Sequence, residues 1–575
     1  MSYKKLKECI VDLINNDQVC IVNHEIDPLL DMASVHLKEF KNKGKAIFFT
    51  NIKGTKYKAV SNLFGTFARA KFIFRDSLDI VKDLISFKTD PIKVLKHPLR
   101  VMSTAINLIY SIPKKVSFPK EFKEINITDL PQIKCWKDDG GAFITLPQVY
   151  SEDIEDPGIM KSNLGMYRIQ LSGNDYILNK EIGMHYQIHR GIGVHHKKAI
   201  DKGLPLKVSI FIGGPPAHTF AAVMPLPEGI SELAFAGVLA KRRFRYTRKD
   251  GYVISCDADF VICGEIYPDD IKKEGPFGDH LGYYSLKHDF PFLRVDKVYA
   301  KDDGVWPFTV VGRPPQEDSQ FGKIIHSITG KVIEKEIPGL KKINAVDASG
   351  VHPLLLAIGS ERYIPYQLVS QPQEILTIAN HILGTGQLSL AKFLFIANEH
   401  ANLDVNNEEE FFNHFFKIVD WNRDLHFQTN TTIDTLDYSG DGLNIGSKVV
   451  IAAAGGIKRE LLDKKIKINL PKGFSKPRLV SKGNLVIEAN KNSIHDLIFS
   501  LENQELNGIS FITVVDDSDF VSKHFSNWLW VAFTRSNPAK DIFGLNSKII
   551  DKHFSCDIPV LDARIKPHHA PVLKR

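Results

Sequence analysis

The hydrophobic pattern changes twice along the chain, and each change indicates a different kind of fold. Near the N-terminus, apolar residues with helical spacing alternate with strand-like runs at 19–23 and 45–52. Between about 130 and 315 short strands dominate, and helices and strands alternate again further on. Because 575 residues are too many for one hydrophobic core, the sequence predicts a multidomain protein of α/β and α+β class.

We place the predicted domain boundaries where the pattern changes. The predicted parts are an N-terminal α/β domain at 1–122, a central β-rich domain with a barrel-like or sandwich-like core at 123–325, a C-terminal α/β domain at 326–455 and a C-terminal extension at 456–575. The first boundary ends a Pro- and Lys-rich stretch that is typical of a linker. In the central domain, Asp302-Asp303-Gly304 predicts the turn of a β-hairpin.

The last third of the chain repeats one order of elements. A helical face at 375–383, a buried-type strand at 392–398 and a helix at 408–419 come first. A helical face at 494–501, a strand at 509–515 and a helix at 523–533 follow in the same order. This order predicts a second, diverged copy of a helix–strand–helix unit. Chance recurrence of a common α/β pattern is the alternative.

Charge and composition exclude several classes of protein. A net charge of +7 is mild for this length and the basic residues are scattered, which argues against a nucleic-acid partner. A modest positive field suits anionic small molecules. Six cysteines without a CxxC pair are typical of the reducing cytoplasm. The first residues lack a signal-peptide core, and no apolar stretch reaches the roughly 18–20 residues that span a bilayer. We therefore expect a cytoplasmic protein.

One apolar stretch, Val101 to Ile112, has basic residues on both sides. These flanking residues are Lys93, Lys96, Arg100, Lys114, Lys115 and Lys120. The pattern fits a segment that touches a membrane surface, which would make the protein peripheral to the inner membrane. A buried helix with basic ends is the favoured alternative, because the stretch is short.

The segment from Glu274 to Asp279 is the first candidate for chemistry. Gly275, Pro276 and Gly278 dictate a tight backbone path between the two acids. A rigid turn that holds two carboxyl groups can place a proton donor against a bound substrate. Burial would raise the pKa of one acid, and a nearby arginine would lower that of the other. A surface turn with solvated acids is the alternative.

Oxygen donors and an arginine form the second candidate. Asn163 offers an uncharged oxygen that suits Mg²⁺ or Mn²⁺, and Glu232 could complete such a site as a hard oxygen donor. Arg168 could pair with a carboxylate or grip a phosphate in a fork. Taken alone, these residues fit a turn and the end of a helix equally well.

A histidine cluster is the third candidate; it comprises His185, His189, His195 and His196. On a helix, His185 and His189 would share one face at the spacing of a zinc pair, which motivates a zinc-dependent hydrolase as an alternative function. The glutamate of the HExxH motif is missing, and Gly191 and Gly193 argue against a long helix here.

The order and spacing of the motifs resemble the UbiD family of decarboxylases. The matching segments are NLGMYR (163–168), HRG (189–191), PLPEGISELAFAG (225–237), EGPFGDHLGYY (274–284) and VGRPP (311–315). Upstream segments at 61–70, 130–136 and 141–145 match as well, as do the strand after Lys392 and YSGDGLNIGSK (438–448). The resemblance covers residues 1 to about 450.

The resemblance implies a split-barrel-like flavin-binding central domain and a carboxy-lyase activity. It implies prenylated FMN as cofactor, supplied by a flavin prenyltransferase and bound through a divalent metal, usually Mn²⁺, with K⁺ nearby. The implied substrate is an aromatic acid, of hydroxybenzoate type if the chain serves ubiquinone biosynthesis, and the implied assembly is a homo-oligomer. The chemistry agrees, because loss of CO₂ from an sp² carbon needs a cofactor as electron sink.

Roles for particular residues follow from the same resemblance. The implied metal ligands are Asn163, Glu232 and His189, with His195 as the rival histidine. The implied catalytic residues are Arg168, Glu274 and Asp279, with Asp279 as the proton donor. The implied flavin contacts are Met166, Tyr167, Arg168, His185, Tyr186, Gln187, Arg190 and Gly191, and Lys392 is the implied pocket lysine.

The chain departs from the family pattern after about residue 455, where common members end. Residues 514–542 look more like the usual C-terminal segment of the family than residues 398–412 do. One hypothesis is that the tail replaces or extends an oligomer contact. Two other functions stay open for the same site: an aromatic carboxylase that runs the reverse reaction, and a flavin-binding partner subunit without turnover.

Overall fold

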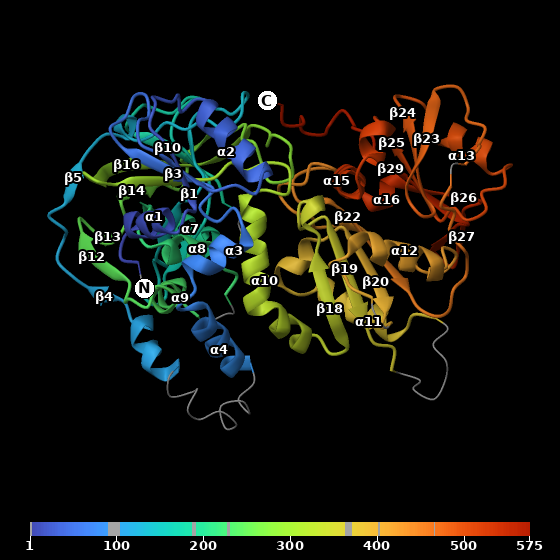
Figure 1. The fold of residues 1–575 in the computed structure, drawn as a ribbon, viewed down its shortest axis with the longest axis horizontal. Helices are drawn as coiled ribbons and strands as arrows, with labels where there is room; N and C mark the ends of the chain where they lie inside the picture. Colours follow the sequence, from blue (N-terminus) through green and yellow to red (C-terminus); the bar gives the residue numbers. More distant parts are fainter. Residues whose placement is uncertain are drawn as a thin grey trace. The chain divides into compact units, whose positions relative to one another are not determined.

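The structure is a computed structural model that describes residues 3–89, 104–186, 191–226, 230–362, 371–400, 403–464 and 466–574 (Figure 1). The chain forms two compact units. The first comprises Met1–Asp279, Tyr283–Gly330 and Val572–Arg575, and the second comprises His280–Gly282 and Lys331–Pro571. In the part of the chain that is described, no helix combines the length and the apolarity that crossing a bilayer requires.

The first unit begins with a four-stranded sheet whose order is β1-β2-β3-β17. Its strands are β1 (Val19–Val22), β2 (Ala46–Phe49), β3 (Lys58–Ser61) and β17 (Val305–Phe308), and its helices are α1 (Leu6–Asn15), α2 (Asp31–Lys41), α3 (Phe67–Ile73) and α4 (Leu78–Thr89). The first two strands lie where the sequence predicts them. The hairpin predicted at Asp302–Gly304 is wrong, because β17 pairs in parallel with β3. All four residues of β17 are buried, which suits a strand covered on both faces.

The central sheet has ten strands, and its strand pairs are antiparallel. Its order is β6-β9-β10-β16-β14-β11-β7-β8, and β15 and β5 also pair with β16. The strands are β5 (Phe122–Glu124), β6 (Phe143–Ile144), β7 (Gln148–Ser151), β8 (Asn163–Gly165), β9 (Ile169–Gln170), β10 (Glu181–Met184), β11 (Leu206–Ile212), β14 (Phe260–Ile266), β15 (Ile271–Glu274) and β16 (His288–Lys301). A bulge between Cys263 and Gly264 bends the β14–β16 ladder.

One hydrophobic core joins this sheet to the N-terminal sheet. Ile47 and Phe49 of β2, Trp306 of β17, and Ile210 and Ile262 of the central sheet belong to the same buried cluster. The N-terminal and central parts of the sequence therefore fold as one compact unit. The predicted boundaries at 122, 325 and 455 stay predictions.

Short helices cover the central sheet. They are α7 (Gly191–Asp201), α8 (Pro216–Val223) and α9 (Glu232–Leu239), and α10 (Glu317–Glu336) follows β17. Gly191 and Gly193, which argue against a long helix through the histidine segment, lie at the start of α7, and His185 lies outside this helix. A Cβ on Gly191 would lie 2.2 Å from Asn163 Oδ1. The close approach of α7 to β8 therefore requires a glycine at position 191. A glycine in a helix costs only about 1 kcal/mol relative to alanine, so the helix still forms.

The second unit contains two five-stranded sheets with the same topology. The first has the order β18-β19-β20-β22-β21 and the second the order β23-β24-β25-β29-β26. The strands are β18 (Leu340–Ala345), β19 (Leu354–Gly359), β20 (Phe393–Asn398), β21 (Leu425–Thr431), β22 (Gly446–Ala453), β23 (Phe474–Ser481), β24 (Asn484–Ala489), β25 (Phe511–Val515), β26 (Ile542–Leu545) and β29 (Ile558–Asp562). In both sheets the outer pairs are antiparallel and the inner pairs are parallel. The tail thus repeats a whole sheet.

Helices complete each copy and carry the contact between the copies. They are α11 (Glu374–Leu383) and α12 (Glu408–Ile418) in the first copy, and α13 (Ile494–Leu501), α14 (Ser518–Ser522), α15 (Phe525–Thr534) and α16 (Pro538–Asp541) in the second. Phe412 of α12 packs edge-on against Trp528 of α15, with ring centres 5.1 Å apart. Phe416 stacks on Phe511 at 5.6 Å. Aromatic side chains therefore hold the two copies together.

Candidate active site

Arg168 lies at the centre of a buried acid–base cluster in the first unit. It follows β8, and its Nε and Nη2 donate to the two carboxylate oxygens of Glu274 at 2.9 and 2.8 Å. Its Nη1 donates to Asp279 Oδ2. The side chains of Arg168 and Glu274 are 9% and 0% exposed. The three residues singled out in the sequence thus meet, and the alternative of solvated surface acids is wrong.

Two more groups fix the guanidinium. Arg168 Nη2 donates to Ser285 Oγ at 3.0 Å, and the guanidinium lies 4.8 Å from the centre of the Phe277 ring. Such a forked, stacked arrangement is specific to arginine, because a lysine offers a single point charge. With two acids and one base, the cluster has one more acid than base and can carry an exchangeable proton.

Asp139 organises the turn that carries Asp279. Its carboxylate accepts hydrogen bonds from the backbone N–H groups of Cys135 at 3.2 Å, Trp136 at 2.9 Å and Gly278 at 2.7 Å. Burial raises the pKa of Asp139 to about 6, although these N–H donors act in the opposite direction. Sequence reasoning missed this residue. Its only local signal is the run of Asp138, Asp139 and two glycines, which is typical of a turn.

Other backbone contacts hold the same turn from both sides. Gly275 N–H donates to Gln170 Oε1 at 2.9 Å, and Gly140 N–H donates to the carbonyl of Pro276 at 2.7 Å. A Cβ on Gly140 would lie 2.3 Å from the Gly275 carbonyl oxygen. Only glycine therefore allows this close approach. The result is a turn whose acids are placed by the backbone and not by flexible side chains.

Asn163 and Glu232 form the oxygen-donor pair. Asn163 Nδ2 is buried without a hydrogen-bond partner, and Tyr167 Oη donates to Oδ1 at 3.5 Å. Glu232 begins α9, and its carboxylate accepts a hydrogen bond from the backbone N–H of Leu164, the neighbour of Asn163. Burial raises the pKa of Glu232. An amide oxygen beside a buried carboxylate is a donor set that fits a hard divalent cation.

His195 of α7 is linked to this pair through Ser151. Its Nδ1 lies 2.9 Å from Ser151 Oγ, and Ser151 is the direct partner of Asn163 in the β7–β8 ladder. Burial lowers the pKa of His195, so that the ring is neutral at pH 7, as a metal ligand must be. His189 lies outside the described residues, as do Gln187 and Arg190.

Of the predicted flavin contacts, His185 is close enough to interact with Arg168, Glu274 and Asp279. Met166 N–H donates to the Ala222 carbonyl at 2.9 Å. The His185 ring packs 4.3 Å from Phe290, and burial lowers its pKa to about 4 with Arg168 acting in the same direction. Tyr186 Oη lies 2.7 Å from His196 Nδ1. His185 directly follows β10 in extended chain, so the described residues contain no helix that would pair it with a second histidine for zinc.

Lys392 lies in the second unit, directly before β20. Its Nζ forms an ion pair with Asp437 at 2.8 Å and donates to Ser439 Oγ at 2.6 Å and to the Ser536 carbonyl at 2.8 Å. Burial lowers the pKa of Lys392, and Asp437 opposes this shift. The charge of Lys392 is thus compensated inside this unit, and its contact with a flavin stays a prediction.

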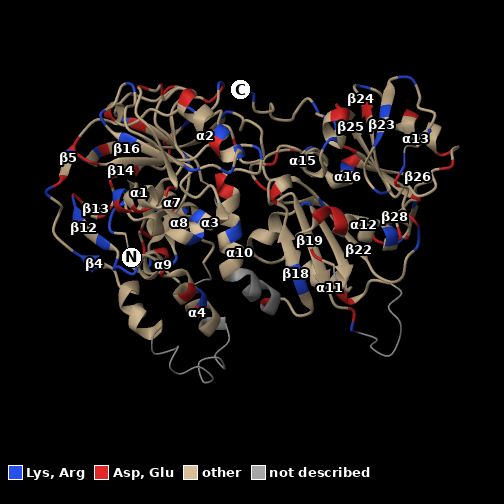
Figure 2. Cartoon of the chain, viewed as in Figure 1, with Lys and Arg blue, Asp and Glu red and all other residues tan. Residues whose placement is uncertain are grey.

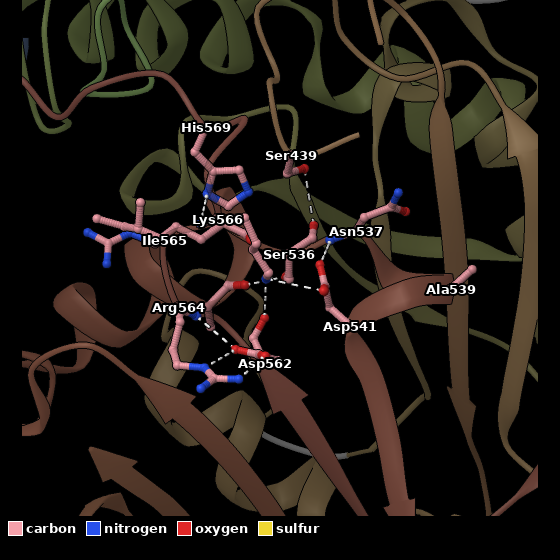
Figure 3. Close-up of polar contacts among 12 residues, drawn as sticks. Ser439, Ser536, Asn537, Ala539, Asp541, Asp562, Arg564, Ile565, Lys566 and His569 are labelled. Carbon is pink, nitrogen blue, oxygen red and sulfur yellow. Dashed lines mark hydrogen bonds and ion pairs between the residues drawn. The ribbon is translucent and has the colours of Figure 1, made fainter. Parts of the chain in front are cut away.

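A second ionic network lies beside Ser536. Lys566 Nζ donates to the Asp562 carbonyl at 2.6 Å and forms an ion pair with Asp541 at 3.2 Å, while Arg564 pairs with the Asp562 carboxylate at 2.6 Å (Figure 3). Asp562 ends β29, Asp541 ends α16, and Arg564 and Lys566 follow β29, so the ion pairs fix the end of the chain onto the second copy.

A second group of possible metal ligands also lies in the second unit. His280, His352 and Asp434 bring three ligand atoms within 4.8 Å of one another. His352 Nδ1 contacts Asp434 Oδ2, and such a contact fixes the tautomer of the ring.

A buried arginine that organises two acids, together with an oxygen-donor pair, is typical of an acid–base enzyme and not of a binding module. Comparison with known proteins agrees with this class. Three family profiles match in order: the N-terminal domain of 3-octaprenyl-4-hydroxybenzoate carboxy-lyase at 10–88, its Rift-related domain at 112–314 and its C-terminal domain at 319–453. The chain belongs to this family of carboxy-lyases, the UbiD family, as the resemblance implied.

Relatives extend the match into the tail. A protein of Chlamydia trachomatis is 33% identical over 97% of this chain and 95% of its own length. A protein of Chlamydia pneumoniae that is named as one subunit of a 4-hydroxybenzoate decarboxylase is 33% identical over 95% of this chain and 91% of its own. A protein of Archaeoglobus fulgidus is 31% identical over 79% of this chain and 92% of its own. The chlamydial proteins therefore share most of the tail.

Solved structures share the fold. The closed form of the vanillic acid decarboxylase of Sedimentibacter hydroxybenzoicus gives a TM-score of 0.67 at 22% identity, covering 82% of this chain and 96% of that chain. The UbiD-class enzyme HmfF of Pelotomaculum thermopropionicum, in complex with FMN, gives 0.61 at 18% identity, covering 81% of this chain and 97% of that chain.

Proposed function

We propose that the chain is a non-oxidative decarboxylase of an aromatic acid, of hydroxybenzoate type, that uses prenylated FMN and takes its proton from Asp279. The observation that carries the proposal is the buried fork of Arg168 on Glu274, with Asp279 on the next guanidinium nitrogen. Family membership supports the reaction class, and the name of the Chlamydia pneumoniae relative supports the substrate class.

The chain's residues would act as follows. Arg168 orients the substrate carboxylate, and Glu274 positions Arg168. The bond between the ring and the carboxyl carbon breaks, CO₂ leaves, and the electron pair stays with the ring carbon. Asp279 then delivers a proton to that carbon and recovers one from water. When bound, the prenylated flavin supplies the electron sink that no side chain offers.

The residues present fit the cofactor and its metal. Asn163 and Glu232 would hold a divalent cation, Mn²⁺ in this proposal, with His195 as the described histidine at the same end of the sheet. In this assignment the cation binds Asn163 Oδ1, which otherwise accepts a long hydrogen bond of 3.5 Å from Tyr167 Oη. The buried and unpartnered Nδ2 of the same amide is a donor that calls for an acceptor, such as a phosphate oxygen of the cofactor. We also propose that a flavin prenyltransferase supplies the cofactor and that the chain forms a homo-oligomer.

The test is co-expression with a flavin prenyltransferase, anaerobic purification, and measurement of CO₂ release from a panel of hydroxybenzoic acids. Wild type should release CO₂ from at least one acid, and Asp279→Asn should lose turnover while it keeps the flavin absorbance. Asp289→Asn, which alters an exposed acid on β16, is the matched control. A flavin-loaded wild type that neither decarboxylates nor carboxylates any phenolic ring would favour a partner subunit without turnover.

A further inference from the structure

An exposed apolar segment follows the N-terminal part of the first unit. Residues 104–107 are helical and continue into the 3-10 helix η1 (Leu108–Ser111). Four large side chains stand in solvent: Ile106 is 71% exposed, Leu108 45%, Ile109 58% and Ile112 55%. The favoured expectation of a buried helix is therefore wrong for this part of the stretch; residues 101–103 lie outside the described residues. A contiguous apolar patch of this kind marks an interaction surface.

A basic groove of about 530 Å³ opens beside this segment. Six of its eight lining residues are basic, and the full lining is Lys4, Tyr110, Lys114, Val116, Lys241, Arg242, Arg243 and Arg245. Asp257 neutralises part of this charge, because it pairs with Arg242 at 3.1 Å and Arg245 at 3.3 Å. Among the described residues, no carboxylate forms an ion pair with Lys114, Lys241 or Arg243. The groove therefore presents a surplus of positive charge.

Hydrogen bonds join the groove and the apolar segment into one surface. Arg243 donates from Nε to the Ile112 carbonyl at 2.7 Å and from Nη2 to the Pro113 carbonyl at 3.2 Å. Next along the chain, the two-residue strand β4 (Lys114–Lys115) pairs in parallel with β12 (Arg245–Lys249), which itself pairs with β13 (Tyr252–Ser255). Figure 2 shows the uncharged helical segment beside the basic positions of β4 and β12.

We propose that this surface docks the enzyme on a membrane that contains anionic phospholipid. The isoleucines would enter the boundary between headgroups and acyl chains, and the groove would take a lipid phosphate. Charge complementarity selects this occupant. A second copy of the chain would bring like charges together, and a nucleic acid would leave the isoleucines in water. The proposal is independent of the proposed reaction, because it uses none of the residues assigned to catalysis.

The surface adjoins the element that carries one proposed metal ligand. Glu232 is the first residue of α9, and α9 ends at Leu239, two residues before Lys241. A Cβ on Gly237 of this helix would lie 2.0 Å from the Tyr110 carbonyl oxygen, so α9 and the apolar segment are in close backbone contact. The docked surface is therefore one short helix away from the candidate metal site.

The test is sedimentation of the full chain with vesicles of phosphatidylcholine alone and with about 30 mol% phosphatidylglycerol. We expect binding to the anionic vesicles to be at least about tenfold tighter than to the neutral ones, and to weaken with salt. The double variant Ile106→Asn/Ile109→Asn and the charge variant Lys114→Glu/Lys241→Glu should each reduce binding by about fivefold or more.

Matched controls separate the surface from general effects. Ile549→Asn/Ile550→Asn changes two isoleucines of β27 (Lys548–Ile550) that are 77% and 57% exposed, and it should leave vesicle binding unchanged. Ile109→Trp adds a readout that does not depend on a loss of binding, because the fluorescence of the new tryptophan should shift to the blue when anionic vesicles are added. An equal loss in the control, an unshifted spectrum or no vesicle binding by wild type would overturn the proposal.

Two further outcomes would assign the surface to another occupant. We expect millimolar inorganic phosphate to displace the protein from vesicles no more strongly than sodium chloride of equal ionic strength does. A much stronger displacement by phosphate would point to a free anion in the groove. A change in the mass of the native assembly in the isoleucine variant would point to a second copy of the chain. Either result would contradict membrane docking.

Discussion

Arg168 holds Glu274 through two parallel hydrogen bonds of 2.9 and 2.8 Å, while its remaining terminal nitrogen reaches Asp279. The two acids are thereby given different tasks. Glu274 is completely buried and engaged through both oxygens, which suits a positioning residue. Asp279 lies on the turn after Gly278, where the backbone brings it to the guanidinium, which suits a proton donor.

Removal of one partner from this buried ion pair should lower the free energy of unfolding. In Glu274→Gln, Arg168 keeps its charge but loses the opposing carboxylate, so we expect the free energy of unfolding to fall by about 3 kcal/mol. Asp289→Asn breaks the pair with Lys273, in which both side chains are more than half exposed, and should change it by less than about 1 kcal/mol. Chemical unfolding followed by circular dichroism measures both. Equal effects would show that the fork adds no more than a surface pair.

The pKa of Asp139 gives stability a pH dependence with a defined sign. Burial raises this pKa from 3.8 to about 6 in the folded protein, so the folded state binds a proton that the unfolded state releases in this interval. The contribution of Asp139 to stability is therefore present below the unfolded value and is lost as pH rises through about 6, by roughly 3 kcal/mol in total.

Asp139→Asn isolates this effect, because asparagine does not titrate. Between pH 4 and about pH 7, the unfolding free energy of wild type should fall relative to that of the variant. The variant should also lose turnover, since its amide group cannot accept the hydrogen bond from Gly278 N–H while its oxygen serves Cys135 and Trp136. Parallel pH curves for the two proteins would contradict this account.

Sequence patterns predicted the elements better than their partners. The apolar runs that form β1, β2 and β20, rich in β-branched and aromatic residues, lie where expected, because a strand's composition is local. The partner of β17 was misjudged, because a turn signal shows where a chain bends and not which strand receives it. Asp139 was missed for the same reason. It serves Gly278, 139 residues away, and nothing at either position in the sequence signals the pairing.

In the candidate site, too, residues with a local motif were predicted and residues defined by long-range contacts were not. Arg168, Glu274 and Asp279 were singled out by their residue types and their motifs, and the fold brings them together. Ser285 and Gln170, which complete the setting, are ordinary polar residues in strand and loop sequence and carry no motif of their own. The tail shows the opposite case. Recurrence of element order predicted a repeated unit, and the structure contains two sheets of identical topology.

Metal content tests the oxygen-donor pair. Asn163→Ala and Glu232→Gln should each lower the Mn²⁺ retained by the purified protein by about tenfold or more, because each removes a ligand. His352→Ala alters the second cluster of possible ligands and should leave the Mn²⁺ content unchanged. Elemental analysis at a fixed pH decides. Loss of Mn²⁺ in His352→Ala alone would move the metal to the second unit.

The contact between the two sheet copies makes a reciprocal pattern that stability measurements can test. Lys392, directly before β20, donates to the Ser536 carbonyl after α15, and Ser510, directly before β25, donates to the Phe416 carbonyl in α12 at 3.2 Å. Equivalent positions in the two copies thus reach across to each other. Lys392→Met should lower the free energy of unfolding by about 3–5 kcal/mol, because it leaves the buried Asp437 carboxylate without its partner.

The double variant Lys392→Met/Asp437→Asn separates charge from packing. It removes both charges, so it should recover a large part of the stability lost in Lys392→Met. Ser510→Ala is the matched change in the other copy; it breaks no ion pair but removes the hydrogen bonds of Ser510 with Trp421 and Phe416 and the long one of 3.5 Å from Arg459, and it should cost about 1 kcal/mol. If the double variant were no more stable than Lys392→Met, the hydrogen bonds from Lys392 to Ser439 and Ser536, and not its charge, would hold the copies in register.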